Sequence, residues 1–173
     1  AMDANPVQVL RRGRDSSLWL AFEEVAAGRA DGCVSGGNTA AMMAVGVKLL
    51  GRLHGIQRPA LMAYVSNLNG HTGMLDLGAN LSVSAHQLAQ FAVMGAELVS
   101  ALEGIERPTV GLLNIGQEEI KGNEQVKEAH ELLSAAELNY VGYVEGDDIY
   151  LRDNLDIVVT DGFVGNVALK NTE

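Results

Sequence analysis

The sequence lacks a second cysteine, an excess of basic residues and any long apolar run. Cys33 is the only cysteine among 173 residues, which excludes an internal disulfide framework and fits a reducing compartment. Lys and Arg number 12 against 22 Asp and Glu, and the net charge of −10 repels nucleic acid. No stretch approaches the ~20 consecutive apolar residues that cross a bilayer. We therefore expect a cytoplasmic protein that binds no nucleic acid.

The signatures of several common catalytic sites are also missing. There is no Gly-x-Ser-x-Gly elbow for a serine nucleophile. Neither a nucleotide P-loop nor a dinucleotide fingerprint occurs, so ATP and NAD are not indicated. The histidines have no metal-ligand spacing and no cysteine cluster beside them, so no metal site is predicted. They are His54, His71, His86 and His130.

The sequence does contain an alternation of helical and strand-like apolar patterns. Helical patterns cover residues 18–28, 40–50, 84–102 and 124–136, and a further helix begins near residue 166. Strand-like runs cover residues 32–35, 60–65, 74–77, 110–115, 140–144 and 155–160. Such alternation predicts an α/β fold in which helices pack on a mainly parallel sheet. The length suffices for one core but is short for two full domains, so we expect residues 1–173 to form a single domain.

Three stretches rich in glycine and asparagine each follow the end of an expected strand. They are Ser35-Gly36-Gly37-Asn38-Thr39, residues 114–123 and residues 161–166. A turn that opens a helix leaves backbone N–H groups unpaired, and the helix dipole there favours an anion. The stretches together predict one polar crevice along the carboxyl edge of the sheet. The alternative for the first stretch is an ordinary turn in which Asn38 caps a helix.

Two charged residues each have two interpretations that the sequence leaves open. Asp76 lies within an apolar strand, and a buried carboxylate needs partners, so it either fixes a neighbouring loop or has a functional role. Lys121 follows Glu118 and Glu119 in a highly charged segment. This segment is either a solvated surface or a place where an ammonium neutralises phosphate or a developing oxyanion.

Taken together, several motifs resemble the bacterial phosphate acyltransferase family of phospholipid synthesis. The match covers essentially the whole chain in order, through residues 14–17, 35–39, 55–61, 75–80, 90–95, 111–116 and 161–170. The resemblance implies transfer of a long-chain fatty acyl group from acyl carrier protein to inorganic phosphate, which gives the acyl phosphate used to make phosphatidic acid. Phosphate attacks a thioester directly, so no cofactor is expected.

The resemblance also has implications for fold and assembly. It implies a three-layer α/β/α fold similar to phosphate acetyltransferases and to the isocitrate and isopropylmalate dehydrogenase group. It further implies a homodimer that associates peripherally with the membrane. Because members of this family are longer at both ends, we expect this chain to be the middle part of such an enzyme.

The turns and the resemblance together indicate the residues of the site. Lys121 and Asn166 are the expected catalytic donors near the reacting centre. The expected phosphate- and substrate-binding residues are Ser35, Asn38, Thr39, Asn80 and Asp161. Two other functions stay open at this point: a phosphate acetyl- or butyryltransferase that uses acyl-CoA, and a non-catalytic module that binds an anion or a carrier protein.

Overall fold

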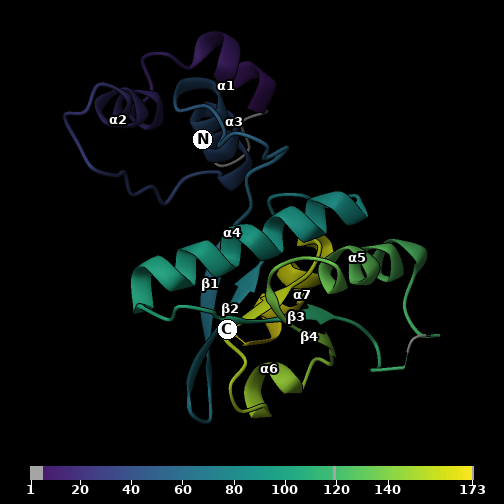
Figure 1. The fold of residues 1–173 in the computed structure, drawn as a ribbon. Coiled ribbons are helices and arrows are strands. Elements are labelled where there is room, and N and C mark those ends of the chain that lie inside the picture. The colour runs from purple at the N-terminus through teal and green to yellow at the C-terminus, as the bar shows by residue number, and fades with distance from the viewer. Residues whose placement is uncertain (1–5, 119, 173) are drawn as a thin grey trace. The chain divides into compact units, whose positions relative to one another are not determined.

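The computed structural model describes residues 6–118 and 120–172, and the chain divides into two compact units (Figure 1). The first unit ends at Pro59, and the second begins at Ala60. Whether the two units form one domain, as expected for residues 1–173, stays a prediction.

The first unit is helical. It contains α1 (Pro6–Arg12), α2 (Ser17–Ala26) and α3 (Thr39–Leu49). Both α1 and α2 contact α3, around a small core of Trp19, Phe22 and Val45 against which Cys33 packs. Side-chain oxygens of Ser16 and Asn38 cap α2 and α3 by accepting backbone N–H groups, which fixes where these helices begin.

The strand expected for residues 32–35 is wrong. The segment has no regular structure, and Val34 is fully exposed. A strand requires a neighbour that pairs with its backbone groups, and the residues described in this unit form no other strand. A short apolar run therefore gave a misleading signal here.

The second unit is built on a five-stranded sheet in the order β1-β2-β5-β3-β4. Its strands are β1 (Met62–Asn67), β2 (Gly70–Leu75), β3 (Thr109–Leu113), β4 (Asn139–Val144) and β5 (Ile157–Val159). β1 pairs antiparallel with β2, and the remaining pairs are parallel. The predicted α/β fold with a mainly parallel sheet is confirmed. The polar residues 66–72 extend β1 and β2 into a hairpin rather than only linking them.

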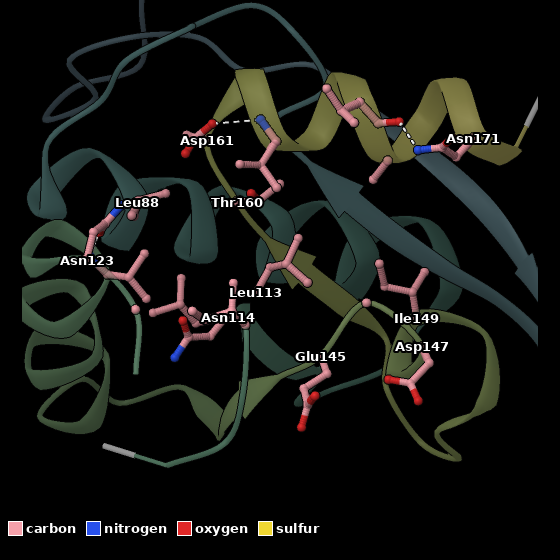
Figure 2. A pocket seen from close by; sticks show the side chains of 18 of the residues that line it. Leu88, Leu113, Asn114, Asn123, Glu145, Asp147, Ile149, Thr160, Asp161 and Asn171 are labelled. Atoms are coloured by element: carbon pink, nitrogen blue, oxygen red, sulfur yellow. Dashed lines mark hydrogen bonds between the residues drawn. The ribbon is translucent and has the colours of Figure 1, made fainter. Parts of the chain in front are cut away.

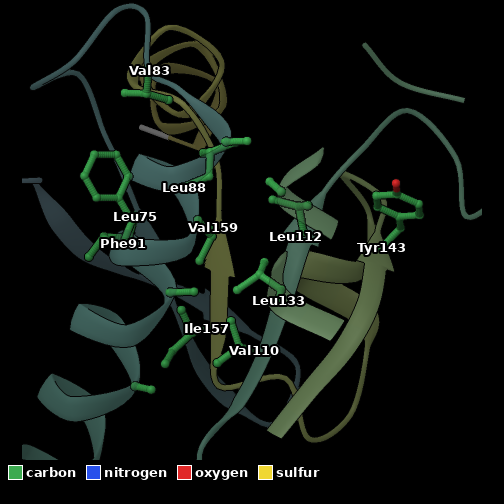
Figure 3. Close-up of a cluster of buried hydrophobic side chains, with 14 of the residues drawn as sticks. Leu75, Val83, Leu88, Phe91, Val110, Leu112, Leu133, Tyr143, Ile157 and Val159 are labelled. Carbon is green, nitrogen blue, oxygen red and sulfur yellow. The ribbon is translucent and has the colours of Figure 1, made fainter. Parts of the chain in front are cut away.

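Helices cover both faces of this sheet. They are α4 (Ala85–Glu103), α5 (Glu124–Ser134), α6 (Asp148–Leu151) and α7 (Gly162–Thr172). Because side chains alternate along a strand, Ile157 and Val159 of β5 pack with α4 and α5, as Figure 3 shows around Phe91 and Leu133. Val158 packs on the other face, against the cluster that includes residues of α6 and α7. The unit therefore has three layers.

Gly165 allows α7 to lie directly against the end of β2. A Cβ at this position would overlap the backbone oxygen of Asp76 and lie 2.9 Å from Cγ2 of Thr160. Because neither neighbour is the free end of a flexible side chain, we expect Gly165→Ala to lower the free energy of unfolding by about 3 kcal/mol. Urea denaturation measures the change.

Gly146→Ala is the matched control, because a Cβ at Gly146 meets no atom within 4 Å. This variant should keep the wild-type stability to within about 0.5 kcal/mol. Equal losses in the two variants would show that the close approach of α7 is not what requires glycine at position 165.

Candidate functional site

A crevice of about 720 Å³ lies at the carboxyl ends of β3, β4 and β5 (Figure 2). Asn114 follows β3, Glu145 follows β4 and Thr160 follows β5, and all of them line the crevice. Residues of α4, α5, α6 and α7 complete the lining. Residues from three strand ends and four helices thus meet at one edge of the sheet.

The position of the crevice follows from the path of the chain. β3 and β5 are neighbours, but α5, which follows β3, lies on one face of the sheet and α7, which follows β5, lies on the other. In parallel sheets, such a reversal opens a crevice outside the strand ends, where ligands bind. The predicted turns at residues 114–123 and 161–166 meet here. The turn Ser35–Thr39 belongs to the first unit.

The wall of the crevice is mainly aliphatic, although the sequence predicted a polar crevice. The apolar lining residues are Leu88, Leu112, Leu113, Ile115, Val126, Ile149, Val164, Val167 and Ala168. They come from the strand ends and from helices on both faces of the sheet. Sequence reasoning missed this wall, because it was directed at glycine and asparagine.

Three polar residues of the crevice support its framework through hydrogen bonds. Nδ2 of Asn114 donates to the backbone oxygen of Lys121 at 3.3 Å. Oδ1 of Asn123 accepts from the N–H of Val126 at 2.8 Å and so caps α5. Oδ1 of Asp161 accepts from the N–H groups of Phe163 and Val164, each at 2.9 Å. Asp161 therefore orients the first turn of α7, whereas its expected binding of phosphate or substrate stays a prediction.

The charged side chains that line the crevice are carboxylates: Glu145, Asp147 and Asp161. The ammonium of Lys121 lies close by, 2.8 Å from Oε2 of Glu118, and both side chains are about half exposed. The hydrogen bond to Glu118, together with the charges of Glu118 and Glu145, raises the pKa of Lys121. Lys121 is therefore an ammonium at neutral pH.

The structure places the two expected catalytic residues in separate hydrogen-bonded groups. Lys121 follows the crevice residue Asn114 on the loop after β3 and pairs with Glu118. The amide of Asn166 donates to the backbone oxygen of Leu77 at 3.5 Å and lies against Gly78. The catalytic roles of Lys121 and Asn166 stay predictions.

Asp76 is the centre of a buried network beside this edge of the sheet. Its Oδ1 accepts from the N–H groups of Leu61 and Ala79 at 3.0 Å. Its Oδ2 accepts from the backbone and side-chain nitrogens of Asn80 at 2.7 and 2.8 Å. The carbonyl of Asn80 in turn accepts from the N–H of Gly162. The expectation that Asp76 fixes a neighbouring loop is confirmed, whereas substrate binding by Asn80 stays a prediction.

The remaining expected binding residues lie in the first unit. Oγ of Ser35 accepts from the N–H of Gly37 at 3.2 Å. Asn38 caps α3 by accepting from Ala41, and Thr39 is the first residue of that helix and is exposed. Ser35 and Asn38 line a second cavity of about 500 Å³. The capping role of Asn38 is thus present, and anion binding by this turn stays a prediction.

Glu145, Asp147 and Thr160 are crevice residues that sequence reasoning missed. A usable signal existed, because Glu145-Gly146-Asp147 follows an apolar strand and contains a glycine, as the other turns do. Within residues 6–118 and 120–172, no group of three or more His, Cys, Asp or Glu side chains is arranged to hold a metal ion. In the same part of the chain, none of the helices combines the length and apolar character needed to cross a bilayer.

Comparison with known sequences identifies close relatives. A family model described as "Fatty acid synthesis protein" matches residues 1–173. The phosphate acyltransferase of Methylococcus capsulatus is 60% identical over 172 residues, which cover 99% of this chain and 50% of the relative. That of Dichelobacter nodosus is 57% identical over 173 residues, again 50% of the relative. The chain therefore spans about half the length of these curated relatives.

Solved structures share the fold. The EutD phosphotransacetylase from Staphylococcus aureus matches with a TM-score of 0.69 and 19% identity, covering 94% of this chain and 59% of that protein. A branched-chain phosphotransacylase from Enterococcus faecalis V583 matches with a TM-score of 0.62 and 20% identity, covering 89% and 62%. The expected likeness to phosphotransacetylases is therefore confirmed at the level of the fold.

Proposed function

This chain belongs to the fatty acid synthesis protein family, and from that membership we propose that it serves the transfer of a fatty acyl group from acyl carrier protein to inorganic phosphate. The 60% identity with a phosphate acyltransferase over nearly the whole chain is the observation that carries the proposal. The product is an acyl phosphate, an activated acyl donor for making phosphatidic acid.

The proposed reaction is a direct displacement. A phosphate oxygen attacks the thioester carbonyl, and the new C–O bond gives a tetrahedral intermediate with a negatively charged oxygen. The intermediate collapses, the C–S bond breaks, and the carrier leaves as a thiolate that takes up a proton. The protein needs to align the two reactants and to stabilise the oxyanion, which requires no cofactor.

Lys121 is the proposed oxyanion stabiliser. Its ammonium stays charged at neutral pH and lies on the loop that follows β3, next to crevice residues. Asn166 is the second proposed donor, and Asp161 and Asn80 are proposed to hold the start of α7 in place. The phosphate is proposed to bind at the turn that begins with Ser35, through the exposed hydroxyl side chains of Ser35 and Thr39.

We also propose the assembly that the family resemblance implies. The partners are acyl carrier protein and a second copy of the chain, in a homodimer that associates peripherally with the membrane. This chain covers about half the length of each relative. A protein extended to the relatives' length has additional residues that can form these contacts.

A donor comparison tests the proposed activity. This chain, and a version extended to the length of its relatives, are incubated with phosphate and either palmitoyl acyl carrier protein or palmitoyl-CoA. Acyl phosphate is trapped with hydroxylamine and quantified. We expect the extended protein to form acyl phosphate from the carrier-bound donor.

The other outcomes distinguish the alternatives. Formation of acyl phosphate from palmitoyl-CoA but not from palmitoyl acyl carrier protein would favour a CoA-dependent phosphate acyltransferase. Absence of product with both donors from a protein whose circular dichroism shows that it is folded would favour a non-catalytic binding module.

A further inference from the structure

The crevice at the ends of β3, β4 and β5 is formed by aliphatic side chains that lie on several sides of one space. Ile149, which is almost completely buried, lines it from α6, and Leu113 lines it from β3. Val164 and Val167 line it from α7 and are 43% and 50% exposed. Figure 2 shows Leu113 and Ile149 facing the interior of the crevice. Such a surface gains free energy when an apolar ligand removes it from water.

The charges of the crevice disfavour a phosphate group inside it. Glu145 and Asp147 lie close together at one side, as Figure 2 shows, and Asp161 lies at the start of α7. The nearby ammonium of Lys121 is already paired with Glu118. A phosphate dianion in the crevice therefore meets repulsion from carboxylates, whereas a hydrocarbon chain carries no charge and is not affected.

The helix starts at the crevice also offer little to an anion, because side chains of the protein already cap them. Asn123 accepts an N–H group of α5, and Asp161 accepts two N–H groups of α7. The carboxylate of Asp161 additionally places a negative charge at the positive end of the α7 dipole. Both caps shape the crevice rather than leave it ready for phosphate.

We infer that this crevice holds the hydrocarbon chain of the acyl thioester and that Val164 and Val167 limit the chain length it accepts. This inference rests on the proposed function, because the proposed function identifies the ligand as an acyl group. A crevice of about 720 Å³ lies within the usual range for sites that bury a small ligand. Each methylene that enters an apolar site strengthens binding by about fourfold.

A binding experiment with neutral thioesters tests this inference on the chain as it exists. The apolar dye N-phenyl-1-naphthylamine is bound first and is then displaced by saturated acyl thioesters of N-acetylcysteamine of increasing length. We expect affinity to rise by about fourfold per methylene until the crevice is filled, and then to level off.

Val164→Phe narrows the crevice and should shorten the chain length at which affinity levels off. Val93→Phe is the matched control, because Val93 is 42% exposed on α4 and does not line the crevice. Circular dichroism verifies that both variants are folded. If Val164→Phe does not fold, Val164→Ala replaces it, and it should weaken the binding of long thioesters while leaving short ones unchanged.

An affinity that is independent of chain length would overturn the inference, as would equal effects of the substitutions at Val164 and Val93. The proposed function fails separately. Length-dependent binding without acyl phosphate formation by the extended protein would refute the proposed reaction and leave the hydrocarbon site standing. Acyl phosphate formation without length-dependent binding in the crevice would refute only the hydrocarbon site.

Discussion

Asp76→Ala is expected to lower the free energy of unfolding of the second unit by about 4 kcal/mol or more, because it leaves buried donors without an acceptor. Asp76 is completely buried, and its carboxylate accepts from three backbone N–H groups and the amide of Asn80. Each buried donor without a partner costs about 1–3 kcal/mol, and water that enters the site recovers part of the sum.

Urea denaturation of this chain measures the loss, with Asp147→Ala as the control. Asp147 is exposed and does not cap α6 through its side chain, so its removal should leave stability nearly unchanged. The loss of unfolding free energy in Asp76→Asn should lie between the losses in these two variants. Asparagine keeps one acceptor oxygen, but its amide NH₂ group faces the donors that the second carboxylate oxygen accepted from. The structural account of Asp76 is wrong if Asp76→Ala unfolds at the same urea concentration as Asp147→Ala.

Lys121→Ala in the protein extended to the length of its relatives is expected to reduce acyl phosphate turnover by about 10²–10³, the usual cost of removing an oxyanion donor. The loss should appear in kcat, because the charge on the oxygen develops only as the reaction proceeds. The substitution spares the fold, since Asn114 bonds to the backbone oxygen of Lys121 and not to its side chain.

Lys127→Ala is the control for general charge effects. The ammonium of Lys127 donates to the backbone oxygen of Ile120 at 2.8 Å, next to Lys121 in the sequence, and no catalytic role is proposed for Lys127. Its removal should change turnover by no more than a few-fold. Turnover of Lys121→Ala that stays within a few-fold of the unsubstituted protein would remove Lys121 from the mechanism.

Much of the fold could be predicted from local patterns. The runs that became β3 and β5 are apolar throughout because both faces of these strands are covered, and such runs are visible in a sequence. α4 was equally visible from its apolar spacing, and Ser84 and Gln87 form the capping box that fixes its start. α6 was missed, because its four residues are too few to show a period.

The strand at residues 32–35 was predicted wrongly for a different reason. Whether an apolar run pairs with a neighbouring strand depends on the rest of the chain, and Val34 has no such partner among the described residues of its unit. The antiparallel direction of β1 was equally hidden, because it depends on the tight turn at Leu68-Asn69 within a polar stretch.

The position of the site could be predicted from the sequence, but the aliphatic lining of the crevice could not. The stretches that begin at Asn114 and Asp161 were identified because each follows an apolar strand and contains glycine, and both of these residues line the crevice. The aliphatic contribution of Val164 and Val167 could not be seen, because it depends on the direction in which α7 leaves the sheet. The ion pair between Lys121 and Glu118 could not be predicted either. The two residues are only three positions apart, but the sequence does not show in which direction their side chains point.

The place of β5 in the sheet affects how the protein is made. β5 follows the other four strands of this sheet along the described chain, yet it lies between β2 and β3 and pairs with both. The ribosome therefore makes β5 after both of the parts that it joins. These parts are the hairpin of β1 and β2 and the pair of β3 and β4. Until residues 157–159 emerge from the ribosome, each half presents an open strand edge, and such edges attract other nascent chains. The joining of these two parts of the sheet thus depends on a strand of only three residues.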